Sequence, residues 1–524
     1  MGSIGDVLLK LGILVVFFGI MVYIGFYCRK HATDVNGFVL GGRSVGPWLT
    51  SFAYGTSYFS AVVFVGYAGQ FGWKYGIAAT WAGIANAILG SLLAWSVLGR
   101  RTRVMTQHLN SATMPQFFEE RFKSRSLKIV ASAIIFIFLI PYTASLYNGL
   151  SRLFAMAFDV DYSICVIVMA VLTAIYVIAG GYMATAINDF IQGIIMLFGI
   201  VAVIVAVLKG QGGFMAALDG LGRVSDPLVS ETPGIFASFF GPDPVNLLGV
   251  MLLTSLGTWG LPQMVQKFYA IKDEKAIQKG TIISTLFAMV VAGGCYFLGG
   301  FGRLFSDVIG VTEAGVPVGG YDAVIPAMLA NLPTILIAIV VVIVLSASLS
   351  TLSSLVLTSS STLTLDFLKD LRKKKMEEKV QLLIMRLLIL VFIVISVVIA
   401  IWQYNSANAF IAQLMGVSWG ALAGAFLAPF LYGLYWKRTT KAACWVSFLF
   451  STVVMILNIF LRPSFPVLLQ SPINAGAFCM LAGLIIVPVV SLFTKAPDKK
   501  LVDSIFACYD KQVTVTVKTS IGEE

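Results

Sequence analysis

One membrane-length segment carries hydroxyl groups along one side. Residues 345–363 read LSASLSTLSSLVLTSSSTL, so more than half of them are Ser or Thr. At 100° per residue, a helix gathers within an arc of about 100° the residues Ala347, Ser350, Thr351, Ser354 and Thr358, with Ser353 about 60° beyond its edge. Hydroxyl and carbonyl oxygens suit a small hard cation, whereas His and Cys suit a transition metal. The pattern predicts a cation site; the alternative is helix packing with hydroxyls bonded back to their own helix.

A second candidate is an acidic residue inside an apolar segment. Asp189 lies in GGYMATAINDFIQG, residues 180–193. A carboxylate in the bilayer costs about 2.5–3.5 kcal/mol on insertion scales unless it is paired or hydrated. Because the neighbouring half of that helix has no Lys or Arg, we expect a cation from solution to be its partner. The alternative is that Asp189 lies at the wet membrane interface.

Composition decides the class of protein. The chain has 524 residues, of which 58% are hydrophobic and 12% are charged, whereas soluble domains carry about 25% charged residues. Apolar runs of about 20 residues each suffice to cross a hydrocarbon core of about 30 Å as a helix, and barrel strands would be shorter and alternating. The sequence therefore predicts an all-α polytopic membrane protein.

The charges set the expected topology. The net charge is +11, and most of the 36 Lys and Arg fall on one side of the expected spans: residues 29–43, 100–128, 267–279, 369–386, 437–441 and 495 onward. This bias marks the cytoplasmic side and argues against nucleic acid as a partner. It predicts the N-terminus outside and the C-terminus inside.

We expect about thirteen transmembrane helices. Their approximate ranges are 7–27, 46–69, 77–99, 128–156, 160–179, 186–208, 245–266, 280–302, 324–365, 381–402, 407–435, 441–461 and 471–494. The run 324–365 is too long for one span, so it should include an outer hairpin or re-entrant piece. The six cysteines show no CxxC spacing and both histidines lie in loops, so neither a disulfide framework nor a transition-metal site is expected.

Two of these spans contain helix-breaking sequences. Residues 54–60 read YGTSYFS and residues 257–263 read GTWGLPQ, five spans apart. Matching breaks in two successive blocks indicate a transporter with an inverted repeat, although packing glycines and a proline kink would look similar. The predicted organisation is an extra helix and loop (1–45), a first five-helix repeat (46–208), an outer loop (209–244), a second repeat (245–435), two further helices (436–494) and a cytoplasmic tail (495–524).

Three motifs resemble those of a known family. LGGRSVGP at 40–47, G-G-x7-D-x2-Q-G at 180–193 and LSASLSTLSS at 345–354 together are similar to the sodium:solute symporter family, which includes sodium/proline, sodium/pantothenate and sodium/glucose transporters. The similarity runs from about residue 5 to 460. It implies a leucine-transporter-like fold with a five-plus-five inverted repeat and extra helices.

The resemblance also implies site residues. The main sodium site would use carbonyls of Thr56, Phe59 and Ala347 and hydroxyls of Ser350 and Thr351. A possible second sodium site would use Asp189, Ser350, Ser353 and Ser354. For the solute we expect Tyr142, which matches a family tyrosine, and near the breaks Tyr58, Ser60, Trp259 and Gln263. Arg43 is a candidate for an inner gate, or else a charge that only sets topology.

Two positions depart from the proline carriers of the family. Tyr58 stands where they carry an Asp beside the ion, and Gly-Leu-Pro-Gln at 260–263 replaces their Tyr-Phe-Gly-Gln segment. These differences weaken the argument for proline itself.

The function we expect is sodium-coupled symport. A carrier in the cell membrane would import a small polar organic solute, an amino acid such as proline or a carboxylate such as pantothenate, by alternating access. It would be no enzyme and would need no organic cofactor; its partners would be the solute, sodium ions and the lipid bilayer. Two alternatives stay open: a proton-coupled permease of the same fold that uses Asp189, and a sodium-coupled sugar transporter.

Overall fold

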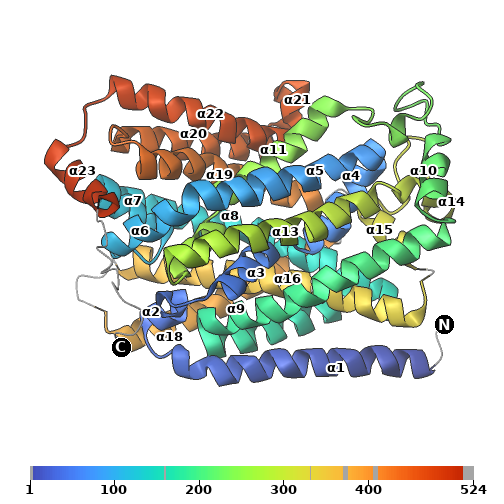
Figure 1. The fold of residues 1–524 in the computed structure, drawn as a ribbon, viewed down its shortest axis with the longest axis horizontal. Coiled ribbons are helices and arrows are strands. Elements are labelled where there is room, and N and C mark those ends of the chain that lie inside the picture. The colour runs from blue at the N-terminus through green and yellow to red at the C-terminus, as the bar shows by residue number, and fades with distance from the viewer. Residues whose placement is uncertain (1–3, 159–160, 331, 370–375, 405–410, 511–524) are drawn as a thin grey trace, which may run out of the picture.

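The computed structural model describes the chain except for residues 1–3, 159–160, 331, 370–375, 405–410 and 511–524. Throughout these described parts the protein is helical, and β-pairing is limited to isolated bridges such as that between Val45 and Ile271. Most helices run along one common direction and form a bundle (Figure 1). The all-α class predicted from composition is confirmed.

The first half of the bundle begins with the long helix α1 and ends in the loop after α9. Its α-helices are α1 (Ile4–Tyr27), α2 (Val35–Leu40), α3 (Pro47–Tyr58), α4 (Ala68–Tyr75), α5 (Thr80–Ala85), α6 (Arg100–His108), α7 (Met114–Phe122), α8 (Arg125–Phe158), α9 (Tyr162–Gly210) and α10 (Phe214–Gly222). Wider π-helical turns at Val62–Tyr67, Asn86–Leu93 and Trp95–Gly99 connect several of them. The outer loop predicted at 209–244 therefore contains the short helix α10.

The second half repeats the alternation of short and long helices. Its α-helices are α11 (Pro244–Gly260), α12 (Pro262–Ala270), α13 (Glu274–Gly299), α14 (Ser306–Ile309), α15 (Val324–Leu329), α16 (Thr334–Thr362), α18 (Glu378–Tyr404), α19 (Ile411–Tyr435), α20 (Lys441–Phe460), α21 (Val467–Gln470), α22 (Pro472–Phe493) and α23 (Lys499–Phe506). The run 324–365 is divided into the short helix α15 and the long helix α16. An outer hairpin or re-entrant piece in this run stays a prediction.

The number of membrane spans depends on where the longest helical runs are divided. Among the described residues, ten helices are long and apolar enough to cross a membrane, or eleven if the bent pair α11 and α12 counts as one span. Two of the runs, Val62–His108 and α9, contain 47 and 49 residues and are interrupted at Gly76 (φ 62°, ψ −143°) and Gly181 (φ 54°, ψ −148°). A straight helix of that length would be about 70 Å, more than twice the hydrocarbon core. Thirteen spans and the orientation of the termini stay predictions.

Both predicted helix breaks are present. Helix α3 ends at Tyr58, where Phe59 is extended (φ −81°, ψ 120°). Helices α11 and α12 meet at Leu261 (φ −78°, ψ 123°) with a bend of 45°. The second break has a covalent cause, because Pro262 has no amide hydrogen and disfavours helical geometry in the residue before it.

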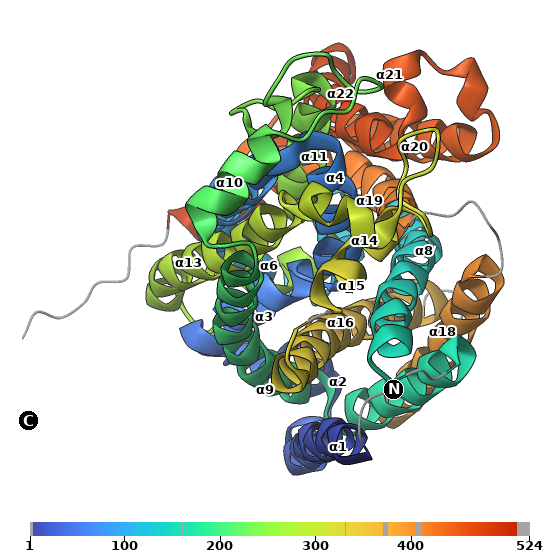
Figure 2. The same ribbon diagram turned by 90° about the vertical axis from the view of Figure 1, so that its right-hand side faces the viewer.

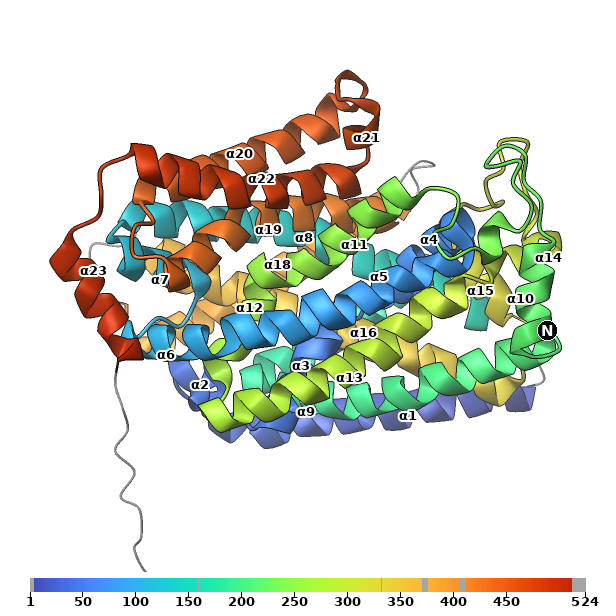
Figure 3. The same ribbon diagram turned by 45° about the horizontal axis from the view of Figure 1, so that its top comes forward.

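Helix α16 is the centre of the bundle. Every residue from Val340 to Thr362 is buried, and the helix packs against α3, α8, α9 and α18. Seen along the bundle in Figure 2, α16 lies among these helices, while α1 and the pair α20 and α22 lie at opposite edges; Figure 3 shows the same edges from the side. Because α16 is surrounded by other helices, its hydroxyl stripe faces protein and not lipid.

Helices approach closely where glycines face each other. A Cβ atom on Gly72 of α4 would lie 1.9 Å from the carbonyl oxygen of Gly299, at the end of α13. Because the obstacle is backbone, we expect Gly72→Ala to push the two helices apart and lower the thermal unfolding temperature of the detergent-purified protein by several degrees, as overpacking typically costs about 1–3 kcal/mol.

Gly12→Ala is the matched control, because Gly12 lies on exposed α1 and a Cβ added there would meet no atom within 4 Å. Equal unfolding temperatures for the two variants would contradict the close approach.

Candidate cation and solute site

Five oxygen atoms converge where α16 passes the broken end of α3. The Ser350 hydroxyl donates to the carbonyls of Thr56 (3.1 Å) and Ala347 (3.0 Å). The Thr351 hydroxyl lies 3.1 Å from the Thr56 carbonyl, 3.3 Å from that of Phe59 and 3.0 Å from that of Ala347. The structure thus brings together all five residues predicted for the main sodium site.

The local backbone explains why these carbonyls are available. A helix leaves the carbonyls of its last turn without amide partners, and α3 ends two residues after Thr56. The hydroxyls of Ser350 and Thr351 supply the missing donors. Each hydroxyl also has lone pairs, so rotation of its O–H bond would let the same five oxygens face a cation. All five residues are buried, so water does not compete for these oxygens.

The hydroxyl stripe of α16 continues toward α12. Ser354 Oγ lies 2.8 Å from Ser57 Oγ and accepts a hydrogen bond of 3.0 Å from Lys267 Nζ. One turn further, Thr358 donates to the side-chain oxygen of Gln266 at 2.8 Å. Ser353 lies off this line and donates to the carbonyl of Ser350 at 2.8 Å. The stripe faces α3, which ends at the first break, and α12, which begins at the second.

Asp189 has a neighbour that the sequence argument did not pair with it. The side chain is fully buried, and its Oδ2 lies 4.0 Å from Nζ of Lys267, which is 2% exposed. The expected partner was a cation from solution, and Lys267 was counted among the charges of the cytoplasmic side. The cation from solution and the cytoplasmic placement of Lys267 stay predictions, but the structure adds a protein cation beside Asp189. The two residues lie far apart in the sequence, on α12 and α9, and meet only in the fold.

An aromatic cluster lies beside the break in α3. The ring centroids of Tyr58 and Tyr142 each lie 5.9 Å from that of Trp419, and all three side chains are buried. Trp419 is a residue that sequence reasoning missed. Its position in the middle of an apolar span was the available signal, because membrane tryptophans favour the interfaces. In the fold its indole packs on Gly257 of α11, close to the second break.

The other predicted solute residues separate into two groups. Ser60 Oγ and both amide atoms of Gln263 are buried and, like the hydroxyls of Tyr58 and Tyr142, have no hydrogen-bond partner among the described residues. Buried polar groups are normally paired, so such atoms at the two breaks indicate room for a polar ligand's bonds. Trp259 differs, because its indole donates to the carbonyl of Leu89 at 2.8 Å and is thereby held toward another helix.

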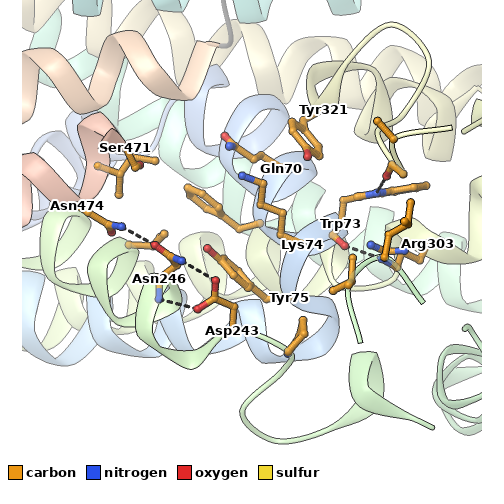
Figure 4. A pocket seen from close by; sticks show the side chains of 18 residues that line it. Gln70, Trp73, Lys74, Tyr75, Asp243, Asn246, Arg303, Tyr321, Ser471 and Asn474 are labelled. Carbon is orange, nitrogen blue, oxygen red and sulfur yellow. Dashed lines mark hydrogen bonds between the residues drawn. The ribbon is translucent and has the colours of Figure 1, made fainter. Parts of the chain in front are cut away.

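A cavity opens at the end of the bundle predicted to be external. It has a volume of about 570 Å³, and Figure 4 shows Lys74, Tyr321 and Asp243 among the side chains around it. Phe71 also lines it, and its ring lies 4.9 Å from that of Tyr67 in the segment that follows the break in α3. By contrast, a void lined by Tyr58, Asn86 and Thr258 measures about 10 Å³.

Arg43 holds helices together at the opposite end. Its guanidinium donates to the carbonyls of Tyr269 (3.2 Å) and Ser111 (2.5 Å) and to the hydroxyl of Thr106 (3.4 Å). Burial, followed by repulsion from Arg103, lowers the pKa of Arg43 to about 10, so the group stays charged at neutral pH. Arg43 therefore connects the loop before α3 with α6 and with the end of α12.

One buried acid near the same end of the bundle was also missed. Asp366 is fully buried and accepts hydrogen bonds from Thr113 (2.6 Å) and from Gln116 (2.7 Å). It lies close to the end of the run that contains α16. Since Asp366 has two donors, we assign it a structural role in fixing α7 against α16.

Comparison with known proteins gives a consistent picture. The family model for the sodium:solute symporter family matches residues 38–450. The osmoregulated proline transporter OpuE of Bacillus subtilis (strain 168) is 28% identical over 94% of this chain and 96% of its own length. A sodium/proline symporter of Staphylococcus aureus (strain JH9) is 31% identical over 92% of both chains.

Among solved structures, a Na+-coupled sialic acid symporter in a substrate-bound, outward-open state has a TM-score of 0.71 at 16% identity, covering 94% of this chain and 99% of that one. That likeness concerns the fold alone. The family match covers the helices that carry the broken ends, the α16 stripe and Asp189, and the sequence relatives extend it over nearly the whole chain. This protein belongs to the sodium:solute symporter family.

Proposed function

We propose that this chain is a cell-membrane symporter that uses the sodium gradient to import a small polar organic solute by alternating access. The observation that carries the proposal is the convergence of five oxygens from Thr56, Phe59, Ala347, Ser350 and Thr351 at the broken end of α3. A sodium ion that enters with the solute gains about 2.3 kcal/mol per 100 mV of membrane potential. That energy would drive accumulation.

The solute we propose is an amino acid such as proline, and next to it a carboxylate such as pantothenate. Support comes from the cluster of Tyr58, Tyr142 and Trp419, whose faces suit a small ring or a cationic amine, while their polar edges and the free amide of Gln263 suit a carboxylate. The relatives named as proline transporters favour the amino acid, whereas Tyr58 in place of an acid favours the carboxylate. A sugar would require more side chains that can hydrogen-bond to its hydroxyl groups than this cluster offers.

Alternating access needs a gate at each end, and Arg43 fits the inner one. Its contacts cross from the loop before α3 to α6 and α12, beside the backbone pairing of Val45 with Ala270 (3.2 Å) and of Lys272 with Val45 (3.0 Å). Breaking these few bonds would separate the two repeats at the inner end. The second sodium site at Asp189 and proton coupling through Asp189 stay predictions that the transport measurements below address.

The double substitution Ser350→Ala/Thr351→Ala tests the ion site. We expect it to abolish sodium-driven uptake into proteoliposomes, or to raise the half-saturating sodium concentration by more than about tenfold, which equals about 1.4 kcal/mol. Uptake is measured for a panel of amino acids, short carboxylates, pantothenate and sugars with inward sodium, choline or proton gradients.

Ser348→Ala is the control, because Ser348 is equally buried but lies on another face of α16. Uptake that follows the proton gradient, or a double variant that behaves like Ser348→Ala, would show that the hydroxyl stripe serves packing.

Tyr142→Phe and Trp419→Leu test the solute site. Loss of one hydroxyl bond is worth about 0.5–1.5 kcal/mol, so we expect Tyr142→Phe to raise the KM for the solute by about threefold to tenfold. We expect a larger loss for Trp419→Leu, because the indole contacts both tyrosines. Tyr147→Phe, another buried tyrosine of α8, should leave the KM unchanged; equal effects of the two Tyr→Phe changes would place the solute elsewhere.

Arg43→Ala tests the inner gate. We expect it to open the inner end, so that a cysteine introduced as Thr358→Cys reacts faster with a membrane-impermeant maleimide in inside-out vesicles. Arg100→Ala serves as control, because Arg100 is an exposed inner arginine that pairs with Glu274. The native cysteines are buried and provide the background rate. If Arg43→Ala labels no faster than Arg100→Ala, the Arg43 contacts do not close the path.

A further inference from the structure

The ammonium group of Lys267 lies beside two of the four residues that the resemblance assigns to a second sodium ion. Its Nζ is 3.0 Å from Ser354 Oγ and 4.0 Å from Asp189 Oδ2, two of the four residues expected to bind that ion. The face of the Tyr182 ring lies 5.1 Å from the same nitrogen. Lys267 is 2% exposed and Asp189 is fully buried, so neither charge is screened by bulk water.

Charge balance follows from this arrangement. A buried lysine and a buried carboxylate are each costly alone, and together they form a neutral pair. Within the described residues, Asp189 has no hydrogen-bond donor, so Lys267 is the group that compensates its charge. A sodium ion in the same place would meet a positive charge within a few ångströms in a region of low dielectric constant, where repulsion is strong.

We propose that Lys267 is a built-in cation that fills the position beside Asp189 and Ser354, so that the chain couples its solute to one sodium ion rather than two. The inference rests on the proposed function, because it concerns the number of sodium ions in that transport cycle. In this proposal Lys267 determines how many sodium ions are coupled. The carboxylate of Asp189 is already neutralised by Lys267 and needs no second sodium ion.

The pair of Lys267 and Asp189 is linked by hydrogen bonds to the five-oxygen cluster. Ser354 Oγ contacts both Lys267 Nζ and Ser57 Oγ, and Ser57 follows Thr56, whose carbonyl belongs to the five-oxygen cluster. Lys267 lies on α12 just beyond the break at Leu261, whereas Asp189 lies on α9. The lysine therefore connects both broken regions and supplies a positive charge without adding a transported ion.

The experiment counts sodium ions per solute. In proteoliposomes the reversal potential of solute-coupled sodium flux gives the ratio, and equilibrium binding of radioactive sodium to the purified protein counts sites independently of transport. For the unsubstituted protein we expect one sodium ion per solute, one binding site and a Hill coefficient for sodium near one. For Lys267→Met, whose side chain has similar length without charge, we expect a second site, a Hill coefficient rising toward two and a larger sodium-dependent increase in unfolding temperature than in the unsubstituted protein.

Two further variants keep the test decisive. Lys267→Met/Asp189→Asn removes both charges and should fold with one sodium site again, even if Lys267→Met is stable only at high sodium. Lys128→Met removes another buried lysine, which pairs with Glu119 at 2.5 Å, and should leave the count at one.

Two sodium ions per solute or two binding sites in the unsubstituted protein would overturn the proposal, as would one site in folded Lys267→Met. Solute uptake that ignores sodium would instead overturn the proposed function, and the binding count would still decide whether Lys267 fills the second position.

Discussion

The hydrogen bonds between hydroxyls of α16 and the open end of α3 are the interaction on which the rest of the site depends. A helix that stops inside a membrane exposes carbonyls to a medium that offers no donors, which is tolerated only where protein or a ligand pairs them. Ser350 and Thr351 pair the carbonyls of Thr56 and Phe59. The same atoms that stabilise the break thus form a set of oxygens suited to sodium.

The burial of α16 follows from the need to pair the open carbonyls of α3. To present hydroxyls to α3 and α12 along three turns, the helix must be surrounded, and the surrounding helices must approach closely. Small residues at the contacts allow this, as where Gly257 receives the ring of Trp419 and Gly193 receives that of Phe52. The peripheral helices α1, α20 and α22 instead expose large apolar side chains, as expected of surfaces in contact with lipid.

The two ends of the bundle differ in a way that suits a carrier. At one end Arg43 and the pairing of Val45 with the end of α12 connect segments from both halves of the chain through backbone carbonyls. At the other end there is a cavity of about 570 Å³, lined in part by Phe71, whose ring packs against that of Tyr67. Among the described residues, the buried hydroxyls of Tyr58, Ser60 and Tyr142 and the amide of Gln263 have no hydrogen-bond partner, and under the proposed function the solute would supply those bonds.

The membrane class and both helix breaks could be predicted from local chemistry, because apolar length, Pro262 and glycines act within one segment of chain. The family and the five residues of the oxygen cluster were implied by the resemblance of three motifs. What lies opposite these residues could be seen only in the folded protein. It paired Asp189 with Lys267, added Trp419 to the aromatic cluster and turned Trp259 toward Leu89. Such contacts join residues far apart in the chain, and no periodicity within one helix encodes which side chain a neighbouring helix will bring to it.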